Sequence, residues 1–228
     1  LTKPHPCPGN CIFCPDDARM PKSYLPDEPA AARAYENKFD PYVQVQARLN
    51  SLVSVGHPIE KIELLVLGGS WDAYGRDYQQ WYIQRCFDAL NGNDSQTLAA
   101  AQKINEPAGS RCVGLSVETR PDEISPDLLV WLRGLGVTKV QMGAQSLNDE
   151  VLARNCRGHT AADTLRACAL LRAAGFKIVL HWMPNLLGAT LDMDRSDFSR
   201  LWERGYCPDE LKIYPTQLLD GTALYEYW

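Results

Sequence analysis

The chain has 228 residues, 45% of them hydrophobic and 22% charged, so it is long enough to bury the core of one folded domain. Its formal net charge of −5 argues against a protein that binds nucleic acid through its own surface alone. It contains no run of about eighteen apolar residues and no secretory leader, so we expect a cytoplasmic protein without a membrane partner.

The first distinctive segment is the loop PCPGNCIFCP at residues 6–15, which holds three of the eight cysteines. The other five are scattered singly, unlike the disulfide framework of a secreted protein. Prolines stiffen the ends of the loop and Gly9 permits a sharp bend. The thiolates of Cys7, Cys11 and Cys14 can therefore surround one centre, and soft thiolates bind zinc, copper(I) or iron–sulfur centres.

Two kinds of centre suit these three thiols. Structural zinc takes four protein ligands, for which His5 is a candidate fourth. A four-iron, four-sulfur cluster on three cysteines leaves one iron open, which S-adenosylmethionine can chelate before electron transfer cleaves it to a 5′-deoxyadenosyl radical. We favour the cluster, because the His-Pro-Cys run leaves little freedom for both side chains to reach one metal and no second CxxC pair is present.

Beyond the loop, residues 27–57 are predicted to be mostly helical with a break at Pro41, and from residue 60 short apolar strands alternate with helices. The predicted strands are 62–67, 112–117, 139–143, 177–182 and 211–215. The clearest helices are 77–90, 125–136 and 160–175. This alternation predicts an α/β fold with a parallel sheet, either an open doubly wound sheet or a (β/α) barrel.

Ligands of such sheets bind at the carboxyl ends of the strands, so the residues that follow each strand are candidate site residues. An arginine there can fork a carboxylate, and a glutamine can bond hydroxyl groups. A carboxylate buried at this edge without a partner would be costly, which suggests a ligand. The candidates for holding a cofactor are Gly68, Gly69, Ser70, Glu118, Gln145 and Arg157.

Each of these candidates also has a purely structural interpretation. A tight turn explains Gly68 and Gly69 equally well. Glu118 can form a structural ion pair with Arg120 or Arg157. His181 lies near the end of the fourth predicted strand, and we interpret it as a packed, hydrogen-bonded histidine.

The segments between the motifs carry a more specific resemblance. The Cys-x3-Cys-x2-Cys loop is similar to the signature of the radical S-adenosylmethionine (SAM) superfamily. The segments PKSYLPDEPAAARA, FDPYVQVQARL, GHPIEKIELLVLGGS, RCVGLSVETRPD, NCRGHT, LKIYPT and GTALYEYW resemble, in that order, the radical domain of the Elongator catalytic subunit family. The resemblance implies a partial TIM barrel over residues 1–228, a 4Fe-4S cluster on the three cysteines, and SAM held at the rim.

The same resemblance implies an enzyme of tRNA modification. Members of the family carboxymethylate carbon 5 of the wobble uridine with acetyl-coenzyme A as carbon source. Lys61 matches a position assigned to acetyl-coenzyme A binding, although a solvated lysine is a nearly equal alternative. We expect the first strand to be truncated at Leu1 and Thr2. We also expect a basic N-terminal segment, a C-terminal acetyltransferase domain and Elongator-type partner subunits outside this sequence.

Two other functions stay open at this point. A radical SAM enzyme acting on a small molecule such as a porphyrin would share the cysteine loop and the rim residues. A noncatalytic, zinc-stabilised interaction module would need only the thiols and a fourth ligand.

Overall fold

The computed structural model describes residues 1–227 and centres on a five-stranded parallel sheet. Its strands follow the chain order β1-β2-β3-β4-β5, and each neighbouring pair is parallel. The strands are β1 (Lys61–Val66), β2 (Arg111–Thr119), β3 (Lys139–Gln145), β4 (Lys177–Trp182) and β5 (Glu210–Ile213). Parallel strands in sequence order form a curled half-barrel, so the predicted partial TIM barrel is confirmed.

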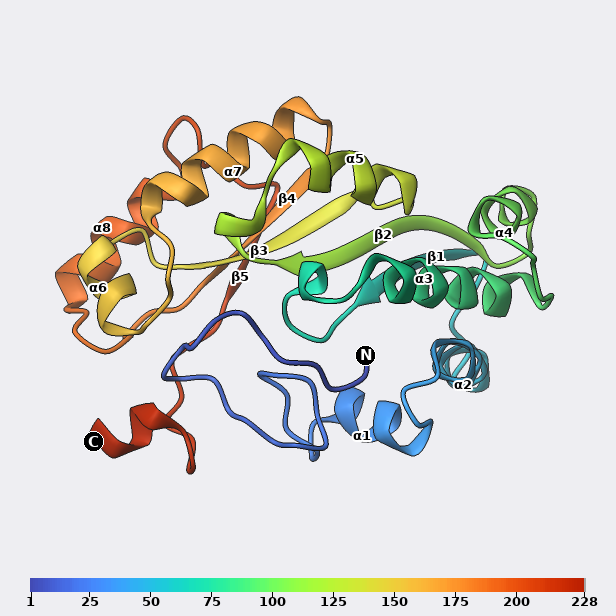
Figure 1. Ribbon diagram of the computed structural model, residues 1–228, viewed down its shortest axis with the longest axis horizontal. Coiled ribbons are helices and arrows are strands. Elements are labelled where there is room, and N and C mark those ends of the chain that lie inside the picture. Colours follow the sequence, from blue (N-terminus) through green and yellow to red (C-terminus); the bar gives the residue numbers. More distant parts are fainter. Residues whose placement is uncertain (228) are drawn as a thin grey trace.

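Helices connect the strands and cover the outer face of the sheet (Figure 1). Those between strands are α3 (Arg76–Asn91), α4 (Leu98–Asn105), α5 (Pro126–Gly134), α6 (Asp149–Arg154), α7 (Ala161–Ala173) and α8 (Leu191–Arg200). Short 3-10 turns occupy Trp71–Ala73, Pro121–Glu123 and Ala223–Tyr227. The three helices named from the sequence correspond to α3, α5 and α7. The sequence does not individually predict α4, α6 and α8.

Capping side chains explain where the predicted helices begin and end. The Ser125 hydroxyl accepts a hydrogen bond from the Leu128 amide, 3.3 Å away, at the start of α5. Thr160 and Asp163 form a capping box at the start of α7. The left-handed φ angles of Gly136 (+87°) and Gly175 (+76°) stop the two helices, as glycine does readily.

The predicted break at Pro41 is also observed. Helix α1 covers Pro29–Glu36 and helix α2 covers Pro41–Ser54. Proline fits the first turn of α2, and the Asp40 side chain caps that turn by accepting from the Val43 amide. Leu1 and Thr2 form no strand in this structure, although the Thr2 amide donates to the Leu67 carbonyl at the end of β1, 2.9 Å away.

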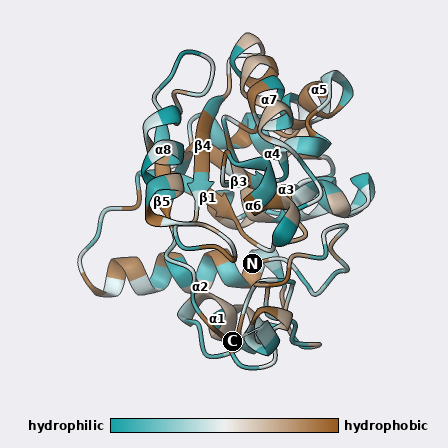
Figure 2. Cartoon of the chain, turned by 90° about the vertical axis from the view of Figure 1, so that its left-hand side faces the viewer, coloured by the Kyte–Doolittle hydropathy of each residue, from teal (hydrophilic) through white to brown (hydrophobic). Residues whose placement is uncertain are grey.

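The two faces of the sheet differ in chemistry. The outer face and its helices enclose the hydrophobic core, and Figure 2 shows the hydrophobic residues along β4 and the hydrophilic surface of α8. The inner face carries polar residues. At the amino end of the strands, Lys139 pairs with Glu63 at 2.8 Å and with Glu210 at 2.6 Å. This ion triad joins β1, β3 and β5 at the amino end of the half-barrel.

The N-terminal loop crosses the inner face, on the side of the sheet opposite α5 and α7 (Figure 1). Its position places the cysteines at the carboxyl ends of the strands. Among residues 1–227, no helix is long and apolar enough to cross a membrane.

Candidate active site

A cavity of about 530 Å³ lies between the N-terminal loop and the carboxyl ends of the strands. It unites segments that are distant in sequence, as expected for the rim of a parallel barrel. The predicted site residues that line it are Cys7, Cys11, Cys14, Gly69, Ser70, Glu118, Gln145 and Arg157, together with His181.

Long-range contacts hold the cysteine loop, which has no regular secondary structure. Cys11, Ile12 and Phe13 are buried in a small hydrophobic cluster separate from the main core, together with Val151, Leu186 and Leu224. The Ile12 amide donates to the Asn155 carbonyl at 3.4 Å, and the Leu224 amide donates to the Ile12 carbonyl at 2.8 Å. The loop is therefore anchored both to the segment after α6 and to the C-terminal turn.

The three thiols are free, and each sulfur has one polar contact. The Gly9 amide donates to the Cys7 sulfur at 3.4 Å, and Cys14 Sγ lies 3.1 Å from the Ser23 hydroxyl. The neighbouring Cys14 thiol and the Arg157 guanidinium lower the pKa of Cys11 against the effect of burial. The neighbouring Cys11 and burial raise the pKa of Cys14.

The donor set suits an iron–sulfur cluster better than zinc. His5, the candidate fourth zinc ligand, contacts the Ala73 carbonyl through Nε2 at 2.8 Å and packs on the Tyr74 ring. Within residues 1–227, no three His, Cys, Asp or Glu side chains are arranged around a single metal ion. A cluster binds each thiolate to a different iron, so it does not need the thiols to converge on one ion, and cations beside the loop offset the thiolate charge.

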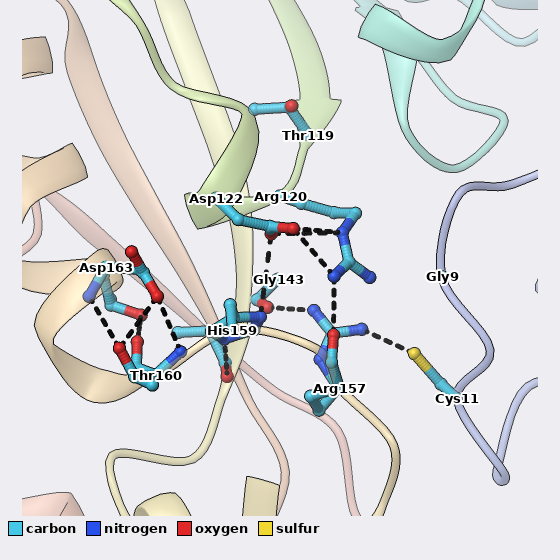
Figure 3. A network of polar contacts seen from close by, with 12 residues as sticks. Gly9, Cys11, Thr119, Arg120, Asp122, Gly143, Arg157, His159, Thr160 and Asp163 are labelled. Atoms are coloured by element: carbon cyan, nitrogen blue, oxygen red, sulfur yellow. Dashed lines mark hydrogen bonds and ion pairs between the residues drawn. The ribbon is translucent and has the colours of Figure 1, made fainter. Parts of the chain in front are cut away.

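Arg157 joins the loop to the sheet. Its Nη1 donates to Cys11 Sγ at 3.0 Å, and its Nη2 donates to the Gly143 carbonyl (Figure 3). Its Nε is buried without a partner, and so is the Oε1 of Gln145. Buried polar atoms normally have partners, so this donor and this acceptor are suited to a polar ligand in the cavity.

Glu118 is not part of a structural ion pair. Arg120 pairs instead with Asp122 at 3.0 Å, and Arg157 bonds Cys11 and Gly143. The Tyr24 hydroxyl donates to Glu118 Oε2 at 3.0 Å. Burial raises the pKa of Glu118, against the opposing effects of Tyr24, Lys212 and the amides after β1. A carboxylate in such a position is available to an amino group of a ligand.

The glycine pair after β1 divides into two roles. Gly68 has φ +144°, and a Cβ there would lie 1.7 Å from the Thr2 hydroxyl oxygen, so it permits the close approach of the N-terminus. It does not line the cavity. Gly69 has φ +80° and lines the cavity with Ser70. The cofactor role of the pair therefore stays a prediction for Gly69, whereas Gly68 accommodates the N-terminal segment.

His181 is hydrogen-bonded on the inner face, as interpreted from the sequence, and it also lines the cavity. Its Nε2 lies 3.0 Å from Gln141 Oε1, while Gln141 Nε2 donates to the Ser116 hydroxyl at 2.9 Å. Because the glutamine oxygen accepts, Nε2 carries the histidine proton. Burial, with Lys212 and Arg157, lowers the pKa of His181 to about 3, so the ring is neutral.

Lys61 is the one predicted residue far from the cavity. It is exposed at the first position of β1, whereas the cavity is lined by Leu65 and Leu67 at the other end of that strand. Four residues of extended strand, roughly 13 Å, separate Lys61 from Leu65.

Sequence reasoning missed several polar residues of the cavity wall, namely Tyr24, Arg120, Gln141, Lys212 and Tyr214. The period-two alternation of β3 and β5 could have found three of them, since residues two apart share a face. No local pattern marks Tyr24 or Arg120.

The chain is similar to several known proteins. The family model described as Radical SAM superfamily matches residues 5–197. A relative from Methanocaldococcus jannaschii named tRNA uridine(34) acetyltransferase is 44% identical over the whole chain, which covers 43% of that relative. Human Elongator complex protein 3 is 35% identical over the whole chain, which covers 44% of it. The chain thus spans less than half the length of these relatives.

Solved structures give the same result. The archaeal Methanocaldococcus infernus Elp3 with an N-terminal deletion aligns with a TM-score of 0.83 and 44% identity, over 85% of this chain and 46% of that one. Coproporphyrinogen III oxidase (HemN) from Escherichia coli aligns with a TM-score of 0.57 and 20% identity, over 96% of this chain and 45% of that one. The second likeness concerns the fold alone.

Proposed function

The chain belongs to the radical SAM superfamily, and from this premise we propose that it is the radical domain of an enzyme that modifies uridine 34 of tRNA. The observation that carries the proposal is the identity of 42–44% over the whole chain with three relatives named tRNA uridine(34) acetyltransferase. The cavity supports it, because the cysteine loop and the rim residues meet there.

Cys7, Cys11 and Cys14 would hold a 4Fe-4S cluster, and the unpartnered groups of the rim would hold SAM. When both are bound, the cluster supplies the electron that breaks a carbon–sulfur bond of SAM, and so provides radical chemistry. Glu118 would accept hydrogen bonds from the amino group of SAM. The buried Arg157 Nε would donate to its carboxylate, and the Gln145 amide would bind a hydroxyl.

The remaining cavity wall would protect this chemistry. Its apolar side chains include Phe13, Pro15, Leu65, Leu67, Met183, Pro215 and Leu219. Such a wall limits the access of water and of other hydrogen donors to a reactive species. The neutral His181 and its partner Gln141 would keep the inner end polar without adding charge.

We further propose carboxymethylation at carbon 5 as the outcome, with tRNA as substrate and acetyl-coenzyme A as co-substrate. The position of Lys61 outside the cavity means that any contact it makes with acetyl-coenzyme A is separate from the SAM site. Elongator-type subunits are the proposed partners, by analogy with the relatives named Elongator complex protein 3.

Deletion of the gene in its natural host tests the function of the whole protein. Mass spectrometry of nucleosides from bulk tRNA should show loss of the carbon-5 modification at position 34. Reintroduction of the wild-type gene should restore it, whereas the Cys11→Ala gene should not. An unchanged nucleoside profile in the deletion strain would refute the proposal.

A further inference from the structure

Arg120 is the second guanidinium beside the cysteine loop, and nothing in the proposed function uses it. It follows β2 directly, and its side chain is only 8% exposed. Figure 3 shows it between Asp122 and the loop at Gly9. A buried arginine is costly unless its charge serves a partner, so the contacts of this side chain indicate its role.

Two edges of the guanidinium are occupied. Its Nε and Nη2 donate to the Asp122 carboxylate at 3.1 Å and 3.0 Å. Its Nη2 also donates to the backbone carbonyl of Arg157 at 2.5 Å. Arg120 therefore fixes the residue whose own Nη1 reaches Cys11 Sγ.

The third edge faces the cysteine loop. A Cβ at Gly9 would lie 2.3 Å from Arg120 Nη1 and 3.6 Å from Cys11 Sγ, so the glycine allows the guanidinium to approach the loop. Although burial alone would lower the pKa of Arg120, Asp122 and the Cys11 and Cys7 thiols raise it. The positive charge is therefore retained next to the thiols.

The edge of the Arg120 guanidinium that faces Gly9 is the positive end of the Arg120–Asp122 ion pair. Asp122 lies on the side of the guanidinium away from Gly9 (Figure 3). The Asp122 carboxylate also lies 3.9 Å from His159 Nδ1. This histidine is neutral near pH 7, because burial lowers its pKa to about 4. Arg120 and Asp122 thus form a charge pair that directs its cation at the loop.

We propose that Arg120 is a positioning residue that holds Arg157 and directs a buried positive charge at the cysteine loop, where it favours one-electron reduction of the cluster. The inference rests on the cluster of the proposed function. Reduction adds one electron, taken from a low-potential one-electron reductant, and no proton, so the cluster becomes more negative by one charge. A fixed cation nearby stabilises the reduced form, and net charge is a main determinant of cluster potentials.

The test is a redox titration of the anaerobically reconstituted chain, followed by the electron paramagnetic resonance signal of the reduced cluster. Arg120→Gln leaves the Asp122 charge uncompensated and should lower the equilibrium constant for reduction of the cluster at least tenfold. For one electron, this is a fall of 59 mV or more in the midpoint potential. Asp122→Asn leaves the Arg120 charge uncompensated and should raise the potential. Arg120→Lys should stay closer to wild type than Arg120→Gln, because it keeps the charge.

Arg172→Gln is the matched control. Arg172 also bonds backbone carbonyls, those of Gly205, Tyr206 and Cys207, but does not line the cavity, so its replacement should not change the potential. Equal potentials for wild type, Arg120→Gln and Asp122→Asn would overturn the proposal. If Arg120→Gln does not assemble a cluster, the direction of the Asp122→Asn shift decides. Failure of the wild-type chain to bind iron would instead reject the proposed function.

Discussion

Arg157 donates from Nη1 to the sulfur of Cys11 at 3.0 Å, although the two residues are 146 positions apart. The contact joins the cysteine loop to the segment after α6, and therefore to the end of the sheet that Gln145 occupies. In the proposed function, this one side chain would couple binding of the cluster to binding of SAM. The predictions that follow separate the contributions of the loop, the rim and the surface.

Each cysteine of the loop should be required for a cluster. Anaerobic reconstitution with iron and sulfide should give about four irons per chain in the wild type, and Cys7→Ala, Cys11→Ala or Cys14→Ala should lose this iron and the brown colour. Iron analysis and visible absorbance make the measurement. Cys156→Ala and Cys207→Ala are controls at exposed single cysteines and should keep the cluster. One tightly bound zinc per chain, with loop variants that unfold, would favour a structural zinc site.

Glu118→Gln should weaken SAM binding while leaving the folded chain at least as stable at neutral pH. Loss of a charge-assisted hydrogen bond typically costs ~1.5–3 kcal/mol, or one to two decades of affinity, measurable by calorimetry on the reconstituted protein. Glu63→Gln is the control, since Glu63 faces the same interior but belongs to the ion triad at the other end of the strands. Unchanged SAM affinity in Glu118→Gln would assign the carboxylate a structural role.

The same variant predicts a change in how stability depends on pH. Burial raises the folded-state pKa of Glu118 above its ordinary value of 4.5. Above that value the folded state keeps a proton that the unfolded state has released, so the free energy of unfolding falls as the pH rises through this window. Urea titrations should show a smaller fall for Glu118→Gln than for wild type. A steeper fall would mean that the charged form is the stabilised one.

Gly68→Ala should destabilise the fold more than Gly56→Ala. Both glycines have positive φ, +144° and +81°, so both alanines carry backbone strain. Only at Gly68 would the new Cβ meet an atom, the Thr2 hydroxyl oxygen at 1.7 Å, whereas nothing lies within 4 Å at Gly56. Urea midpoints measure the difference, and equal midpoints would show that the N-terminal segment moves aside without cost.

The chain by itself should bind tRNA weakly, with an affinity that falls steeply as salt increases. Its net charge is −5, and two of the cations near the cysteine loop are already paired, Arg19 with Asp17 and Lys22 with Asp16. Lys3 lies over the Tyr78 ring. Filter binding at several salt concentrations gives the slope, and tight, salt-insensitive binding would reveal a tRNA site outside these cations.

Cofactor cleavage and substrate modification should also separate in this chain. Reduced with dithionite, it should slowly form 5′-deoxyadenosine from SAM, because the thiols and the rim groups are all present in one cavity. It should leave tRNA uridine unmodified even with acetyl-coenzyme A present. Chromatography measures the 5′-deoxyadenosine, and nucleoside mass spectrometry measures the modification of uridine. Carboxymethylated uridine in the products would mean that residues 1–228 contain the whole substrate site.

Local signals made much of the fold predictable. Each predicted strand begins and ends within two residues of the observed β1 to β5. Strands covered by helices are short continuous apolar runs bounded by turn residues, which makes them visible in the sequence. The caps Ser125 and Thr160 and the terminal glycines marked helices α5 and α7. The spacing of the cysteines, likewise, is a property of a few adjacent residues.

Only the tertiary structure decided which side chains meet. Gln141 lies level with Glu118 on β2 and with Val179 on β4. Ser116 and His181 are each two residues from those positions, so they share the inner face with Gln141 and bond it diagonally. The Arg120 guanidinium lies next to Gly9 and donates to the Arg157 carbonyl. It does not form the ion pair with Glu118 that is one interpretation of the sequence. The physical reason is range: caps, periodicity and loop motifs act over a few residues, whereas strand register and the placing of the N-terminal loop depend on packing across the whole chain.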